Sequence, residues 1–281
     1  MSTLNNLEKV YINDLKSIYP EKEIKSIFKL LILELFKINS ISFLLKKYNT
    51  VSSSKEKKII EYLNRLQKYE PVQYILGYTN FLDLKFKLNN HVLIPRKETE
   101  ELVIWCKSFL NKRNKILDIG TGSGCIAISL AKDQMVTAID VCNDALKIAK
   151  YNAKLNGVNI KFIKDDILQF NEKSILIEKQ DIIISNPPYV LIDQIKKMHK
   201  NVYMHEPRSA IFVNSEDPLI FYKKIIQFSK RNLNKNGLLF FEINEFFGEK
   251  IVSLLKKNKF QEIELKKDIY KKNRMVKALF N

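Results

Sequence analysis

An apolar run, a glycine-rich loop and a second apolar run follow one another between Lys115 and Ala131, and this order constrains the fold most strongly. Ile116 to Ile119 is short and apolar enough for a buried parallel strand. The glycines after it allow a tight turn and a close approach to a ligand, and the next helix aims its first N–H groups there. We therefore expect a ligand to contact the loop Gly120, Thr121, Gly122, Ser123 and Gly124.

This loop does not match the dinucleotide-binding fingerprint, because Cys125 stands where that pattern needs glycine or alanine. A second strand, Val136 to Ile139, ends at Asp140, which lies 20 residues beyond Gly120. A carboxylate at that place accepts hydrogen bonds from ribose hydroxyls. The alternative role of Asp140 is to cap the helix that follows, and both roles are compatible with one turn.

A further apolar run, Asp181 to Ser185, ends abruptly in Asn186-Pro187-Pro188-Tyr189. Both prolines lack an N–H and fix φ, and Pro187 keeps Asn186 extended, so the backbone leaves the sheet along a stiff path. An amide side chain, rigid carbonyls and an aromatic ring are presented together, which suits the binding of a planar –NH2 group. The alternative is a proline turn that only closes a buried strand.

From about residue 96 onward, strand and helix patterns alternate, which indicates an α/β fold with a doubly wound, mostly parallel, Rossmann-like sheet. One of its strands, Ile160 to Ile163, ends before Asp165 and Asp166, where an adenine or its amine is expected. In such sheets the ligand lies across the carboxyl ends of the strands. The glycine loop, Asp140, Asp166 and Asn186 all fall at such ends, so we expect them to form one site.

The first part of the chain shows helical spacing instead. Its apolar residues form three stripes: Leu4, Leu7, Tyr11 and Leu15; Ile24, Ile27, Phe28, Leu31 and Leu35; Ile59, Ile60, Leu63 and Leu66. Alternation over Leu82 to Leu88, a turn at Asn89-Asn90 and a return over Val92 to Ile94 predict a β-hairpin. The expected organisation is a helical, substrate-docking domain over residues 1–76, a β-hairpin linker over 77–95 and the α/β domain over 96–281.

Length and composition limit the number of domains and indicate the cellular compartment. Its 281 residues suffice for an α/β domain and one small domain. Cys106, Cys125 and Cys142 form no Cys-x-x-Cys pair, which favours a reducing compartment. No secretory or transit signal and no membrane-spanning run is recognisable, so we expect the cytoplasm and no membrane partner.

The formal net charge of +17 comes mainly from lysines spread over every segment. Proteins that read nucleic acids usually concentrate arginine and aromatic side chains on one face. We therefore interpret the charge as compositional drift that also serves solubility, and we expect that nucleic acid is not required.

Two charged residues outside these motifs are also candidates for specific contacts. Arg96 follows a proline at the domain junction, where we expect it to hold the linker; a contact with substrate backbone is the alternative. Glu242 ends the apolar strand Leu238 to Phe241 and is expected to be a buried partner of Arg96 or Arg208.

The pattern Asp-x-Gly-x-Gly-x-Gly from Asp118, the acid Asp140 and the Asn-Pro-Pro-Tyr motif resemble class I S-adenosylmethionine-dependent methyltransferases that methylate planar nitrogens. The chain is more specifically similar to the protein-(glutamine-N5) methyltransferases that modify peptide chain release factors. From about residue 65 to the end, blocks of that family's signature keep their order: Pro71 to Gly77, Val92 to Arg96, Glu98 to Val103, Glu206 to Ala210, Glu242 to Ile243 and Asp268 to Arg274.

This resemblance implies a methyltransferase of translation termination that uses S-adenosylmethionine and has release factors as its protein partners. The acceptor is the side-chain amide nitrogen of the glutamine in their Gly-Gly-Gln motif. Residues expected to hold the cofactor are the glycine loop, Asp140, Asp166, Ile167 and Asn186; at Ile167 the family often has a tryptophan against the adenine. The chain departs from the family's usual Pro, Gly, Gln and Gly at Lys97, Asn244, Phe247 and Lys271.

The expected mechanism is alignment, with Asn186, Pro187 and Tyr189 as catalytic residues. The Asn186 side-chain oxygen and the Pro187 carbonyl would accept the two N–H groups of the glutamine, and Tyr189 would pack on its amide plane. Pro188 completes the expected substrate-binding set. No metal is expected, because His199, His205 and Glu206 lack the spacing of a metal site.

Two other functions remain open at this point. The tetrapeptide also suits methylation of an exocyclic amine in DNA or RNA, or of a glutamine in a ribosomal protein. A helical first domain in place of a base-reading domain speaks against nucleic acid. The non-enzymatic alternative is an S-adenosylmethionine-binding interaction module, against which the intact glycine loop and Asn186 argue.

Overall fold

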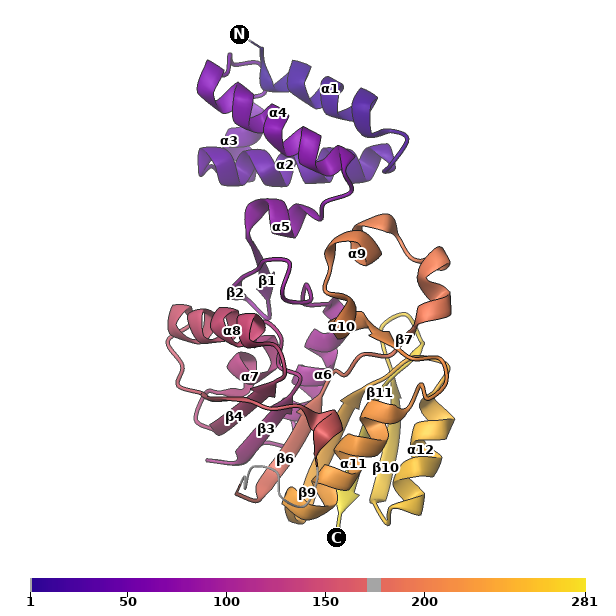
Figure 1. Ribbon diagram of the computed structural model, residues 1–281. Helices are drawn as coiled ribbons and strands as arrows, with labels where there is room; N and C mark the ends of the chain where they lie inside the picture. Colours follow the sequence, from indigo (N-terminus) through magenta and orange to yellow (C-terminus); the bar gives the residue numbers. More distant parts are fainter. Residues whose placement is uncertain (1, 171–177) are drawn as a thin grey trace. The chain divides into compact units, whose positions relative to one another are not determined.

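The computed structural model describes residues 2–170 and 178–281, which form two compact units (Figure 1). The first unit runs to Gly77 and also contains His199–His205. The second unit consists of Tyr78–Met198 and Glu206–Asn281. Every helix among the described residues is too short or too polar to cross a membrane.

Most of the elements are labelled in Figure 1. The helices are α1 (Leu4–Leu15), α2 (Glu21–Phe36), α3 (Ser40–Leu45), α4 (Ser53–Gln67), α5 (Val72–Leu76), α6 (Lys97–Lys107), α7 (Cys125–Leu130), α8 (Asn143–Leu155), α9 (Lys200–His205), α10 (Arg208–Ile211), α11 (Ile220–Asn232) and α12 (Gly248–Lys257), with 3-10 helices η1 (Ile167–Gln169) and η2 (Ile192–Lys197). The strands are β1 (Tyr78–Phe81), β2 (Leu84–Lys87), β3 (Lys115–Ile119), β4 (Met135–Asp140), β5 (Lys161–Lys164), β6 (Gln180–Ser185), β7 (Val190–Leu191), β8 (Phe212–Val213), β9 (Leu233–Glu242), β10 (Gln261–Lys267) and β11 (Asn273–Phe280).

The first unit is a small helical bundle, and its core consists of the predicted apolar stripes. All four residues of the first stripe are buried on α1, and α2 and α4 bury most of theirs. Tyr11 packs edge-on against Phe28 with ring centroids 4.8 Å apart, and its hydroxyl donates to the Ile59 carbonyl at 2.6 Å. This bond satisfies the one polar atom that the tyrosine brings into the core.

The helix α9 completes this first unit, although it comes more than a hundred residues later in the chain. The His199 ring just before it stacks on Tyr19 with centroids 5.9 Å apart. At the end of α9, Nε2 of His205 lies 2.8 Å from the Lys68 carbonyl oxygen. No local pattern in the sequence indicated this assignment.

The hairpin belongs to the second unit and lies earlier in the chain than the sequence predicted. β1 and β2 pair antiparallel, and Leu82 and Asp83 form the turn with φ of 46° and 63°. The predicted turn at Asn89-Asn90 exists only as a loop turn, and residues 92–94 adopt loop structure instead of the predicted strand. The prediction was wrong because two residues with positive φ favour Asn or Gly, and leucine is an unusual choice there.

A seven-stranded sheet forms the centre of the second unit, in the order β10-β11-β9-β6-β3-β4-β5 (Figure 1). The five strands from β9 to β5 are parallel, and β11 runs antiparallel to β9. Since β4 and β5 lie on one side of β3 and β6 lies on the other, the chain order reverses between β3 and β6. The predicted doubly wound, mostly parallel sheet is confirmed.

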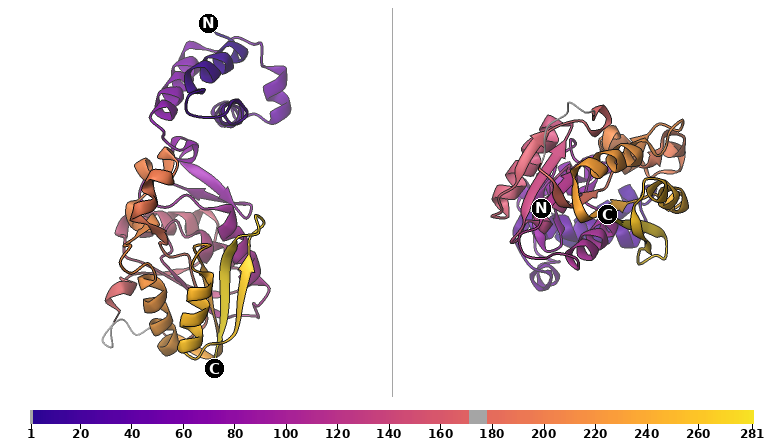
Figure 2. Two further views of the ribbon diagram at one scale, coloured as in Figure 1. Left: turned by 90° about the vertical axis from the view of Figure 1, so that its right-hand side faces the viewer. Right: turned by 90° about the horizontal axis from the view of Figure 1, so that it is seen from below.

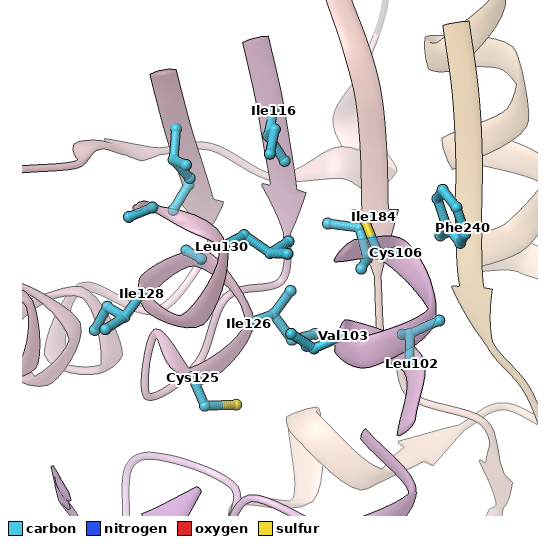
Figure 3. Packing of buried hydrophobic residues seen from close by; sticks show 14 of the residues in the cluster. Leu102, Val103, Cys106, Ile116, Cys125, Ile126, Ile128, Leu130, Ile184 and Phe240 are labelled. Carbon is cyan, nitrogen blue, oxygen red and sulfur yellow. The ribbon is translucent and has the colours of Figure 1, made fainter. Parts of the chain in front are cut away.

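Both faces of this sheet are covered, which explains why its strands are continuously apolar. Neighbouring residues on β6 point to opposite faces: Ile182 and Ile184 pack with α6 and α7, whereas Ile183 packs with α11 and α12. Figure 3 shows the first of these faces, where Val103 and Ile126 meet the sheet. The two layers of helices are also visible in Figure 2.

The ring of Phe240 offers a test of this packing, because it is fully buried against Trp105 and Phe109 with centroids 5.4 and 5.8 Å away. We expect Phe240→Ala to lower the free energy of unfolding by about 3–5 kcal/mol, the usual cost of such a cavity. The matched control is Phe246→Ala, since that ring is 73% exposed. Urea unfolding should show a change of at most about 0.5 kcal/mol for the control; equal losses in both variants would contradict the assigned packing.

Candidate active site

A cavity of about 270 Å³ lies at the carboxyl ends of the central strands, where the chain order reverses. Its volume is near the lower end of the range for small-ligand pockets, which is about 300–1,000 Å³. The walls come from the ends of β3, β4 and β6, the loops that follow β2 and β5, and residues around α10 and α11. Predicted site residues on this wall are Gly120, Gly122, Asp140, Asp166, Ile167, Asn186, Pro187 and Pro188.

The glycine loop after β3 adopts the backbone conformation that only glycine takes without strain. Gly120, Gly122 and Gly124 have φ of 75°, 54° and 82°. The loop is tied to the end of β4, because the Gly120 and Thr121 N–H groups both donate to the Ile139 carbonyl at 2.9 and 3.0 Å. Among the predicted loop residues, Thr121, Ser123 and Gly124 support the turn from outside the cavity wall.

Asp140 combines the two roles that the sequence left open. Its Oδ1 accepts from the Cys142 N–H at 2.8 Å, just before α8, and its Oδ2 accepts from the Gly122 N–H at 2.8 Å. The side chain therefore fixes the turn and still lines the cavity. Each carboxylate oxygen can accept a second hydrogen bond, so two hydroxyl groups of a ribose fit this position.

The wall after β5 combines polar and apolar groups. Asp166 caps η1, since its Oδ1 accepts from the Leu168 N–H at 2.9 Å. Ile167 is buried, and its apolar side chain lines the cavity together with Leu168. Carboxylates at two strand ends and an apolar wall between them fit a nucleoside such as adenosine.

Asp118 lies beneath the glycine loop and is fully buried. Its Oδ2 accepts from the Thr121 hydroxyl at 2.6 Å and from the Ala127 N–H at 3.2 Å, which joins the loop to the first turn of α7. Its Oδ1 has no hydrogen-bond partner among the described residues. Burial raises the pKa of the Asp118 carboxyl from 3.8 to about 7, and the two donors only partly oppose this rise.

At the end of β6, the side chains of the tetrapeptide belong to a hydrogen-bonded group that the sequence did not reveal. The Asn186 Nδ2 donates to the Thr99 hydroxyl at 3.2 Å, and Thr99 donates to Glu242 Oε2 at 2.6 Å. The Tyr189 hydroxyl donates to Glu242 Oε1 at 3.1 Å. Thr99 lies within the block Glu98 to Val103 that resembles the family's signature, but its residue type alone gave no sign of this contact.

The predicted partners of Glu242 were wrong. Its side chain contacts Thr99 and Tyr189, while Arg96 pairs with Glu206 at 2.6 Å. Glu206 Oε2 also accepts from the Ile94 N–H at 3.1 Å, so Arg96 and Glu206 hold the segment after the hairpin, which agrees with the linker role expected for Arg96. Arg96 directly precedes α6 with its side chain 34% exposed, so its guanidinium loses less hydration there than it would at the fully buried position beside Glu242.

Burial shapes the electrostatics around Glu242, which is 1% exposed. Burial raises the pKa of its carboxyl, whereas the Thr99 and Tyr189 hydroxyls and the nearby Arg274 guanidinium lower it. The pKa of the Tyr189 hydroxyl is also raised by burial and by Glu242, so the phenol stays neutral and acts as a donor. No cluster of potential metal ligands occurs in the part of the chain that the structure describes.

Gly124 provides a test of the loop. An added Cβ would lie 2.9 Å from Ile128 Cδ1 and 3.2 Å from Ala149 Cβ, at a φ of +82°. Gly157 is the matched control, because its φ of +67° is similar but nothing lies within 4 Å of a Cβ there. The left-handed backbone costs each alanine variant about 1–2 kcal/mol. The crowding at residue 124 should add about 1–3 kcal/mol.

Thermal unfolding measures the stability of each variant, and calorimetric titration measures its affinity for S-adenosylmethionine. We expect Gly124→Ala to unfold at a lower temperature than Gly157→Ala and to bind S-adenosylmethionine more weakly. Equal stability and equal affinity of the two variants would show that the contact between the loop and α8 is unimportant.

The buried Asp118 carboxyl predicts a pH dependence of stability. Its folded pKa of about 7 exceeds its ordinary value of 3.8, so the folded protein binds this proton more tightly than the unfolded chain. The free energy of unfolding should therefore fall as pH rises from about 4 to 7, by at most about 1.4 kcal/mol per pH unit.

Urea unfolding of the ligand-free protein at several pH values measures this slope. Asp118→Asn should have a flatter slope than the parent protein. Asp144→Asn should keep the parent slope, because Asp144 is solvent-exposed beside Lys147 and its pKa is lowered. An Asp118→Asn slope as steep as the parent's would contradict the assigned pKa.

Comparison with known proteins agrees with the geometry of the site. The family described as "Methyltransferase small domain" matches residues 103–209, and "PrmC N-terminal domain" matches residues 11–77. A solved methyltransferase structure from Pyrococcus furiosus superposes with a TM-score of 0.53 at 18% identity, covering 81% of this chain and 98% of that one. At that identity it supports the fold alone.

Curated relatives are similar over almost their whole length. A release factor glutamine methyltransferase from Flavobacterium psychrophilum is 44% identical over 99% of this chain and 99% of its own. Its counterpart from Bacteroides thetaiotaomicron is 36% identical over 98% of this chain and 99% of its own. Similarity of this degree and extent shows that the chain belongs to the release factor glutamine methyltransferase family.

Proposed function

We propose that this chain transfers a methyl group from S-adenosylmethionine to the side-chain amide nitrogen of the glutamine in the Gly-Gly-Gln motif of peptide chain release factors. Membership of the family supports the reaction and its protein substrate. The structural observation that carries the proposal is the position of Asn186, which directly follows β6 on the wall of the cavity with its –NH2 group turned to Thr99.

The cofactor would occupy the cavity between the glycine loop and the end of β6. Asp140 would accept the ribose hydroxyls, and Asp166 and Ile167 would hold the adenine. S-adenosylmethionine supplies an electrophilic methyl group on a sulfonium, so the protein needs neither a metal nor a covalent nucleophile. The task left to the protein's own residues is to bind and orient the acceptor nitrogen.

Orientation matters because an amide nitrogen is a weak nucleophile, whose lone pair is delocalised into the carbonyl group. The Asn186 Oδ1 and the Pro187 carbonyl would accept the two N–H groups of the glutamine and so fix the plane of its amide. Tyr189 would pack on that plane, and Pro188 would keep the path of the backbone rigid. Preorganised acceptors of this kind typically contribute a large part of an enzyme's rate.

The remaining proposals concern the domain organisation and the cellular compartment. We infer a substrate-docking role for the helical domain over residues 1–76, with 77–95 as linker and 96–281 as methyltransferase domain. Release factors are protein partners of the ribosome, which supports a place in the cytoplasm. The three free cysteines, two of them buried, are compatible with that reducing compartment.

The direct test is to incubate the purified protein with S-adenosylmethionine and an unmodified release factor and to sequence the peptides by tandem mass spectrometry. We expect one added methyl group on the glutamine of the Gly-Gly-Gln motif. Transfer to ribosomal protein or nucleic acid instead, with none to the release factor, would overturn the proposed substrate.

Asn186→Ala tests the role of the amide. The variant loses one of the two acceptors, so kcat should fall by the equivalent of about 2–4 kcal/mol while the fold is retained. Asn258→Ala is the control, because Asn258 caps the C-terminal end of α12 and its side-chain Nδ2 donates to the Leu254 carbonyl of that helix at 2.9 Å. Steady-state kinetics on the release factor compare the two, and normal turnover by Asn186→Ala would remove this residue from the mechanism.

A further inference from the structure

The side chains of Asn186, Thr99 and Glu242 form a chain of hydrogen bonds that leads from the cavity wall into the core. Its members come from the end of β6, the first turn of α6 and the end of β9. Exposure falls along this chain: Asn186 is partly exposed, Thr99 is 2% exposed and Glu242 is 1% exposed. Neither Thr99 nor Glu242 lines the cavity.

The directions of these bonds follow from the chemistry of the groups. Both carboxyl oxygens of Glu242 accept hydroxyl donors, Oε2 from Thr99 and Oε1 from Tyr189, so the single hydroxyl hydrogen of Thr99 points to Glu242. Their separation of 2.6 Å is typical of a hydroxyl that donates to a charged oxygen. The Thr99 oxygen then has only lone pairs to offer to Asn186, at 3.2 Å.

This arrangement decides which end of the Asn186 amide faces Thr99. Its –NH2 group must point to the Thr99 oxygen, and its Oδ1 must point the opposite way. In the reversed orientation, two acceptors would meet at Thr99. The –NH2 group of Asn186 would then confront the –NH2 group of the acceptor, and two donors cannot form a hydrogen bond.

Glu242 also fixes the other functional side chain of the tetrapeptide, because its Oε1 accepts from the Tyr189 hydroxyl at 3.1 Å. The Tyr189 carbonyl accepts from Asn244 Nδ2 at 3.1 Å. Arg274 lies close by, where it donates to the Ile243 carbonyl at 3.2 Å and pairs with Asp268 at 3.1 Å, and its positive charge lowers the pKa of Glu242. One buried carboxylate therefore restrains both ends of the tetrapeptide.

We propose that Thr99 and Glu242 are positioning residues, which set the orientation of the Asn186 amide so that its oxygen faces the acceptor nitrogen. This inference deepens the proposed function and rests on it for the identity of the acceptor. It adds two residues that touch neither cofactor nor acceptor but determine how Asn186 presents its oxygen.

The kinetic test compares Thr99→Val with Thr99→Ser. Valine keeps the shape of threonine but has no hydroxyl, whereas serine keeps the hydroxyl. With S-adenosylmethionine and an unmodified release factor, we expect Thr99→Val to lower kcat roughly 10–100-fold, the usual effect of losing such a bond beside a charge. The KM for S-adenosylmethionine should change little. Thr99→Ser should restore most of kcat, and Thr79→Val, on β1, is the matched control.

A double-mutant cycle shows whether Thr99 acts through Asn186. In the Asn186→Ala background, Thr99→Val should lower kcat no more than about 3-fold, because the amide that it orients is already absent. The same loss in both backgrounds would overturn the proposal, since Thr99 would then act independently of Asn186. A Thr99→Val variant with parental kcat would overturn it as well.

A measurement without the release factor separates this inference from the proposed function. In the full-length protein labelled with 15N-asparagine, the signals of the Asn186 –NH2 group are identified by their loss in Asn186→Ala. We expect Thr99→Val to shift these signals and to speed their exchange with water, and Thr99→Ser to preserve them. Unchanged signals in Thr99→Val would overturn the inference, whereas a parent enzyme that fails to methylate the release factor would overturn only the proposed function.

Discussion

Parallel pairing of β3 with β6 is the constraint on which the site depends. These two strands adjoin where the chain order of the sheet reverses, so the loops that follow them leave in different directions and open a crevice. Their register pairs Ile119 with Ser185, and the Ser185 hydroxyl donates to the Ile119 carbonyl at 2.7 Å. The two strands thus end at the same level, which places the glycine loop beside Asn186.

Sequence patterns were sufficient where local chemistry determines the structure. The apolar runs and the two prolines restrict the backbone of their own segments, and the glycines permit a turn that other residues disfavour, so the sheet and its functional edge could be predicted. Contacts between segments that are distant in the sequence could not be predicted from these local patterns. Thr99 approaches Glu242 only after α6 has packed on the sheet, and a leucine in the left-handed turn at Leu82 depends on the packing of the neighbouring strands. The partner of Arg96 was unpredictable for the same reason.

The four departures from the family pattern have different structural consequences. Lys271 has a φ of 62°, a conformation that the usual glycine takes without strain. Asn244 replaces another glycine and gains a function, because its side chain binds the Tyr189 carbonyl. Phe247 is buried at the start of α12. Lys97 begins α6, where proline is normally well suited, and pairs with Glu100 instead.

The inclusion of α9 in the first unit has a consequence for the evolution of the chain. The polypeptide enters that unit twice, once over the first 77 residues and again over His199–His205, between the tetrapeptide and Glu206. A gene fusion or deletion at a single point can therefore neither remove nor exchange the complete unit. Recombination between relatives would separate α9 from its helical partners, so we expect the two segments to be inherited together and to vary in concert.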